Sequence, residues 1–146
     1  MKKSQKPKYP TKKEILKNQI KFKKNTINII LKWKKEFLPF KNTKPKLKFL
    51  RITILINQLA KLHNKKINIR YNKTIPSFMY HAPTKTIILD KTLSIISSLH
   101  EFAHHLFGKS ELKACKWSVQ LYKLTFPKQY KKLKWKGHTL IKNNQK

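Results

Sequence analysis

The sequence predicts an α+β fold in a single domain. Helical hydrophobic spacing dominates before residue 65 and after residue 91, and three short runs rich in β-branched and aromatic residues lie between. A length of 146 residues is typical of one domain, and 39% hydrophobic residues suffice for a folded core. The expected order is helix, helix, strand, strand, strand, helix, helix, which is an α+β pattern.

Two helices are expected in the N-terminal third. Apolar residues from Thr11 to about Leu38 fit helical spacing, and Pro39 ends that run. After a loop at 41–45, apolar residues recur at intervals of three and four up to Leu62, which predicts an amphipathic helix. Residues 1–10 contain two prolines and many lysines and are typical of a flexible basic arm.

The middle of the chain predicts three strands, and two helices follow them. The strands are expected at 67–71, 77–81 and 86–90, the last two as a hairpin across 82–85. A helix is expected from about 92 to 107, with Gly108 as its C-cap, and another from the N-cap Ser110 to Pro127. The last sixteen residues are basic and aromatic and receive no assignment. We therefore divide the chain into a basic arm and helix (1–45), a core (46–126) and a basic tail (127–146).

Composition excludes several classes of protein. No run approaches 18 apolar residues, which argues against a membrane span, and the N-terminus does not resemble a secretory signal. Cys115 is the single cysteine, so an internal disulfide and a multi-cysteine zinc site are excluded. A cytoplasmic setting is the default expectation.

The net charge of +31 comes from 36 Lys+Arg against 5 Asp+Glu. Such a balance suggests nucleic-acid binding, above all through the first 48 residues. However, only Arg51 and Arg70 are arginines, and the abundance of Lys, Ile and Asn is what AT-rich coding would produce. The charge is therefore weaker evidence for a nucleic-acid partner than its size suggests.

The strongest chemical signal is an HExxH motif, with His100, Glu101 and His104 inside a predicted helix. Positions i and i+4 share a helix face, so both imidazoles can bind one zinc ion. Glu101 would then reach a metal-bound water and act as the general base. This pattern predicts a zinc site of the hydrolytic kind.

The surroundings of the motif support a site rather than a solvated surface. The other faces of the helix are expected to be buried, because they carry the apolar residues Leu99, Phe102, Ala103 and Leu106. Ser97, the three motif residues and Gly108 would form one polar stripe. Three of the five acids, including Asp90 and Glu111, fall within 90–111. Simpler interpretations remain, because Asp90 can cap the following helix and Glu111 suits a helix N-terminus.

A hydrolytic zinc site needs a third protein ligand and an open position. We favour Glu111, which starts the next helix after a glycine turn, and keep His138 as the alternative. His105 is a poor choice, because it points about 100° away from His104 around the helix.

Three further side chains are assigned weaker roles. Tyr122 and Tyr130 are possible stabilisers of a tetrahedral oxyanion, although packing is the simpler interpretation of each. We interpret Cys115 as a buried structural thiol.

Part of the chain resembles the metal-binding core of small gluzincin metallopeptidases, including the ImmA/IrrE-like group. This part is the stretch TIILDKTLSIISSLHEFAHHLFG followed by SELKACKWSVQLYKL. In those families a helix of the form ExxA follows the HExxH helix and its glutamate is the third zinc ligand, which Glu111 and Ala114 match. The chain also resembles SprT-like zinc peptidases, which take a later histidine beside glycine, as at His138. These resemblances imply a zincin-like fold over roughly residues 65–125, and SprT-like enzymes act on DNA-bound proteins.

We therefore predict a small zinc metallopeptidase that hydrolyses peptide bonds of a protein or peptide substrate. The alternative is a lysine-rich nucleic-acid-binding protein whose zinc site is structural or degenerate. A third possibility is an inert protein that merely retains the motif. The sequence does not indicate the substrate, because no specificity pocket can be recognised in it.

Overall fold

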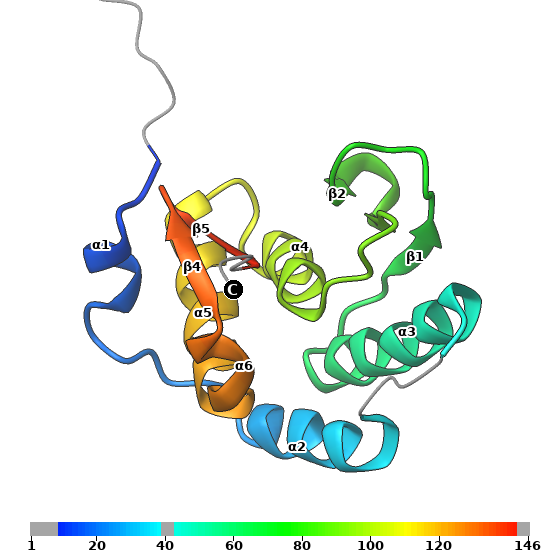
Figure 1. Cartoon of the computed structure of the whole chain (residues 1–146), viewed down its shortest axis with the longest axis horizontal. Helices are drawn as coiled ribbons and strands as arrows, with labels where there is room; N and C mark the ends of the chain where they lie inside the picture. The colour runs from blue at the N-terminus through cyan, green and yellow to red at the C-terminus, as the bar shows by residue number, and fades with distance from the viewer. Residues whose placement is uncertain (1–8, 39–42, 143–146) are drawn as a thin grey trace, which may run out of the picture.

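The computed structural model describes residues 9–38 and 43–142, apart from the side chains of Thr139 and Lys142. It is an α+β structure with a small mixed sheet, as predicted (Figure 1). Most of the predicted arm at 1–10, part of the predicted loop at 41–45 and Pro39 lie outside the described residues. No helix within the described ranges is long and apolar enough to cross a membrane. The elements are α1 (Lys12–Leu16), α2 (Thr26–Phe37), α3 (Pro45–Leu62), β1 (Asn68–Tyr71), β2 (Met79–His81), the 3-10 turn η1 (Ala82–Thr84), β3 (Thr86–Leu89), α4 (Ile95–Phe107), α5 (Glu111–Thr125), α6 (Pro127–Lys131), β4 (Leu133–Lys136) and β5 (Thr139–Lys142).

The three central strands lie within two residues of their predicted positions. Their order is β1-β3-β2, with β3 parallel to β1 and antiparallel to β2. The predicted hairpin between β2 and β3 is confirmed, and Lys85 adopts a left-handed backbone conformation at the turn. Ile87 and Leu89 of the central strand are fully buried. Strand β2 is left at one edge of this sheet.

The prediction of one helix from Thr11 to about Leu38 is wrong. The chain forms two helices there, because Asn18 and Asn25 have positive φ angles of 58° and 77°, a conformation that asparagine tolerates better than most residues. The segment between the helices crosses α5, where the buried Gln120 replaces the missing helical hydrogen bonds. Its amide donates to the carbonyl of Ile15 at 2.9 Å and accepts from the amide of Ile20 at 2.9 Å.

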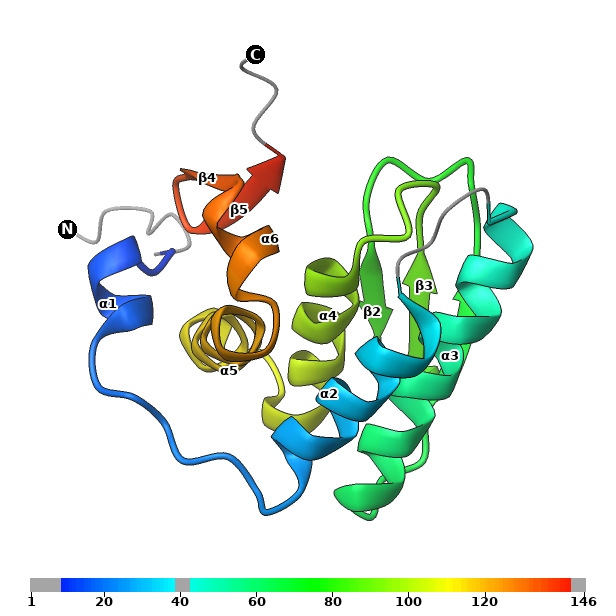
Figure 2. The same ribbon diagram turned by 60° about the horizontal axis from the view of Figure 1, so that its bottom comes forward.

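Helix α4 lies between the three-stranded sheet and helix α5 (Figure 2). It begins at Ile95 rather than about 92, because Ser94 is the N-cap and accepts from the amide of Ser97. Asp90 therefore does not cap this helix, which corrects that interpretation. Its carboxylate instead accepts hydrogen bonds from the amide and hydroxyl of Thr92, at 2.8 and 2.6 Å, in the turn after β3.

Helix α5 is buried on two sides, which the sequence pattern did not reveal. Ala114, Trp117 and Leu121 join the main core, whereas Cys115 and Val119 pack against Ile15 of α1. After α5 the chain forms α6, and the described part of the unassigned C-terminal stretch forms the β4–β5 hairpin, with Gly137 at φ 62° in the turn. This hairpin covers the second side of α5, since Trp135 and Leu140 pack against the small cluster of Ile15, Cys115 and Val119.

Candidate metal centre

Packing in the main core sets the orientation of the motif helix. Leu99, Phe102 and Ala103 are fully buried, as predicted, and Leu106 is half-buried. The Phe102 ring lies 5.7 Å from the ring of Trp117 on α5. With these side chains anchored, the polar side chains of α4 face away from the main core, some toward the first turn of α5 and some toward the cavity.

A three-residue turn brings the next helix back toward this stripe. Gly108 ends α4 with φ 74° and ψ −140°, and its amide donates to the carbonyl of His104 at 2.8 Å. Such a backbone conformation is strained for any residue with a Cβ atom. Ser110 then caps α5 by accepting from the amide of Lys113, as predicted. Glu111 therefore occupies the first turn of α5, facing α4.

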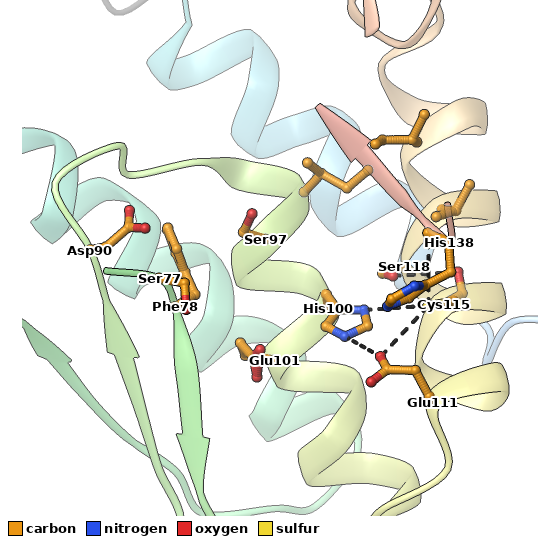
Figure 3. A pocket seen from close by; sticks show the side chains of 13 residues that line it. Ser77, Phe78, Asp90, Ser97, His100, Glu101, Glu111, Cys115, Ser118 and His138 are labelled. Carbon is orange, nitrogen blue, oxygen red and sulfur yellow. Dashed lines mark hydrogen bonds and ion pairs between the residues drawn. The ribbon is translucent and has the colours of Figure 1, made fainter. Parts of the chain in front are cut away.

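One carboxylate oxygen of Glu111 is the common neighbour of three potential metal donors, of which Figure 3 draws His100 and Cys115. Its Oε1 atom lies 2.7 Å from His100 Nε2, 3.4 Å from His104 Nε2 and 3.7 Å from Cys115 Sγ. The His100 and His104 rings meet edge to face at 4.9 Å. The structure thus brings together the two motif histidines and the favoured third residue, and adds a thiol.

The electrostatics of this cluster favour a cation. Hydrogen bonds from His100 and His104 lower the pKa of Glu111 strongly. The pKa of His104 is raised, mainly by its hydrogen bond to Glu111. The proton on His104 therefore supplies positive charge that stabilises the carboxylate, in the place where a metal ion would supply it.

A backbone contact fixes which ring nitrogen of His104 faces Glu111. Its Nδ1 atom lies 2.8 Å from the Gly108 carbonyl oxygen, which can only accept, so Nδ1 carries a proton. Nε2 is then the nitrogen available to a ligand, and metal-bound histidines commonly have such an outer partner. His105 points elsewhere, as predicted, and its Nδ1 is 2.7 Å from the hydroxyl of Tyr80.

Glu101 lines a cavity of about 290 Å³ together with His100, Glu111 and Cys115. Burial is the main cause that raises its pKa, opposed by the two motif histidines. No hydrogen bond joins its carboxylate to another described residue in the structure. Figure 3 shows Glu101 on the side of α4 away from Glu111, toward Ser77 and Phe78, which lead into β2. It is therefore placed to accept a proton from a molecule in the cavity.

Cys115 is 1% exposed and follows Glu111 by one helical turn. Besides its contact with Glu111, its sulfur lies 4.0 Å from His100 Nδ1 and 3.9 Å from the carbonyl oxygen of His138. Burial and the charge of Glu111 raise its pKa to about 12. We interpreted this residue as structural and missed its place in the cluster, although the spacing i, i+4 from Glu111 could have revealed it.

The remaining candidates lie in three different surroundings. His138 lines the cavity, but its ring stacks on that of Tyr9 at 4.4 Å. Tyr122 does not line this cavity: it packs against Phe126 in the main core, and burial raises its pKa to about 12. Tyr130 does not line it either, and Lys123 lies over its ring. The two tyrosines are thus removed from the site, contrary to the suggested oxyanion role.

The donors present fit a metal ion. Among the described residues, the donor atoms of His100, Glu111 and Cys115 lie within 4.8 Å of one another, so these three could hold an ion. Imidazole, carboxylate and thiol are the ligand types that zinc accepts, but they do not by themselves select one metal. Comparisons of the chain with family models, with curated proteins and with solved structures found no match.

Proposed function

We propose that the chain is a zinc-dependent hydrolase of peptide bonds with a zincin-like arrangement. The observation that carries this proposal is the convergence of His100 Nε2 and His104 Nε2 on Glu111 Oε1, beside a cavity that also contains Glu101. Two histidines and a glutamate are three protein ligands, which leaves one position open for water or substrate. When bound, the ion would polarise a carbonyl and lower the pKa of a water molecule.

Glu101 has the properties of the general base and acid. Its raised pKa brings it closer to neutral pH, where one carboxylate can both accept and return a proton. It would accept a proton from the attacking water and pass it to the leaving amine. The core contacts of Phe102 on the opposite face hold the helix that carries it, so little reorganisation is needed.

The sheet supports an extended peptide as the substrate. Among the described strands, β2 pairs only with β3 and is an edge strand of its sheet, so its outer backbone groups can pair with another chain. Ser77 and Phe78, which precede this strand, line the same cavity as His100 and Glu101. A peptide added to this edge would therefore run past the cluster.

Elemental analysis of the purified protein tests the metal centre. We expect one zinc per chain in the wild type, and loss of zinc in His100→Ala, His104→Ala and Glu111→Ala. The matched control is His81→Ala, an exposed histidine of β2 that does not line the cavity. His138→Ala is also expected to keep its zinc. Absence of zinc from the wild type would overturn the proposal.

A hydrolysis assay tests the reaction separately. Casein and DNA-bound protein are suitable substrates, because the specificity is unknown. Glu101→Gln is expected to keep its zinc and lose about 10²–10⁴-fold in rate, which is the usual contribution of a general base. An unchanged rate in this variant would show that the activity does not come from this site.

A second candidate, nucleic-acid binding, is favoured by a basic cavity outside the metal centre. This cavity of about 740 Å³ at the end of α3 is lined by Lys61, Lys65, Lys66 and Lys85 and by no acid. Lysines placed together in this way can contact successive phosphates. Binding there predicts that the affinity for DNA or RNA falls steeply as the salt concentration rises. The slope of affinity against salt concentration should be smaller after Lys65→Ala and Lys66→Ala. A slope unchanged by both substitutions would exclude this cavity as the binding site.

A further inference from the structure

Cys115 lies inside the candidate metal centre although three ligands already suffice for a hydrolytic zinc site. Its sulfur is 3.7 Å from Glu111 Oε1 and 4.0 Å from His100 Nδ1, and Figure 3 shows it between these residues and His138. Simple packing would place a thiol against apolar atoms alone. Here one side of Cys115 packs with Ile15 and Val119. The sulfur itself faces the polar atoms of His100, Glu111 and His138.

Two of the three separations from Glu111 Oε1 are close to those between ligands of a shared ion, whereas His100 Nε2, at 2.7 Å, lies at hydrogen-bond distance and must move apart when an ion enters. With Zn–S and Zn–O bonds of about 2.3 and 2.0 Å, a thiolate and a carboxylate on one tetrahedral zinc lie about 3.5 Å apart. The observed separation of Cys115 Sγ from Glu111 Oε1 is 3.7 Å. An imidazole nitrogen and a carboxylate oxygen on that ion would lie about 3.3 Å apart, and His104 and Glu111 are separated by 3.4 Å. The thiol therefore lies within reach of an ion bound to Glu111.

We infer that Cys115 is a further ligand of the metal ion that His100 and Glu111 hold. The thiol loses its proton to solvent as the sulfur–metal bond forms. A fourth protein ligand closes the position that a hydrolytic site keeps open, so water reaches the ion only when Cys115 dissociates. The inference rests on the metal centre of the proposed function, and it assigns Cys115 the role of holding that centre closed.

Cobalt substitution tests this assignment on the full chain. Zinc is replaced by Co²⁺, metal content is measured by elemental analysis, and the near-ultraviolet absorption is recorded. A thiolate bound to Co²⁺ produces an intense charge-transfer band, which nitrogen and oxygen ligands do not. We expect the band in the wild type and its loss in Cys115→Ser at equal cobalt content. The matched control is Ser118→Ala, which changes another buried residue of the same cavity and is expected to keep the band.

X-ray absorption at the zinc edge of the wild type gives a second answer that needs no variant. We expect one sulfur neighbour at about 2.3 Å. A metal-loaded protein with no sulfur neighbour and no charge-transfer band would overturn the role of Cys115 and leave the proposed function intact. Failure of the wild type to take up any metal would overturn the proposed centre and this inference together.

Discussion

Replacement of Gln120 by alanine is expected to lower the free energy of unfolding by about 3 kcal/mol. Gln120 is 3% exposed, and its side-chain amide donates to the carbonyls of Ile15 and Asn18 at 2.9 and 3.3 Å and accepts from the amide of Ile20 at 2.9 Å. Asn18 is exposed, so water can replace its lost bond. The groups of Ile15 and Ile20 lie in buried and half-buried residues, and each unsatisfied group costs about 1–3 kcal/mol.

Urea denaturation followed by circular dichroism measures this change from the shift of the midpoint at constant slope. Gln58→Ala is the matched control, because Gln58 is an exposed glutamine within helix α3. We expect this control to stay within about 0.5 kcal/mol of the wild type. Hydrogen exchange should also show that the amides of α1 lose protection first in Gln120→Ala, because the Gln120 side chain holds α1 and the segment after it against α5.

The result that would refute the reasoning is a stability of Gln120→Ala equal to that of Gln58→Ala. It would mean that the segment from 17 to 25 does not depend on α5 for its hydrogen bonds. A large loss of stability without early exchange in α1 would show that Gln120 stabilises the core and not the N-terminal segment.

Three further predictions concern the motif helix and its turn. In metal-free protein, the pKa of Glu111 is lowered from 4.5 and that of His104 is raised from 6.5. Glu111 therefore contributes stability that is lost as pH falls below about 4.5, and His104 contributes stability that is lost as pH rises above about 6.5. The stability difference between wild type and Glu111→Gln, measured by urea denaturation, should be largest between these values; a difference independent of pH would contradict the pairing. Phe102→Ala should lower the free energy of unfolding by about 3–5 kcal/mol, because Phe102 is fully buried. Phe107→Ala should lower it much less, because Phe107 is 40% exposed, and similar urea midpoints for the two variants would argue against the assigned core face. Gly108→Ala should lower the free energy of unfolding by about 2 kcal/mol, because alanine is strained at the positive φ of this position. An added Cβ meets no atom within 4 Å, so the strain has no steric part from neighbouring residues. An unchanged melting temperature in thermal denaturation would show that the turn relaxes freely.

Much of the site could be predicted because it lies on two consecutive helices. The i, i+4 spacing places His100 and His104 on one face, and the burial of Leu99 and Phe102 confirms which face is turned inward. Gly108 and Ser110 mark a turn short enough to bring Glu111 back to His104, at 3.4 Å. These relations depend on local geometry alone, so a single sequence contains them.

The cavity itself could not be predicted, because its walls come from distant parts of the chain. Phe78 before β2, Ile96 on α4 and Leu140 on β5 meet around His100 only after the sheet and the hairpin have packed. The i, i+4 spacing places Cys115 on the same face of α5 as Glu111. Only the packing of α5 between α4 and the N-terminal segment buries the thiol of that face beside the donors.

By itself, the sequence determined the α+β class, the three strands of the central sheet and the inward face of the motif helix, and it favoured Glu111 over His138 as the partner of the two histidines. Periodicity, caps and turn residues act over a few residues, so they are legible without the fold. The tertiary structure decided that residues 17–25 cross α5 on Gln120, that the C-terminal tail becomes a hairpin, and that Cys115 faces the donors. Each of these depends on contacts between residues far apart in sequence, because they form only when buried surfaces meet and leave no periodic pattern in the chain.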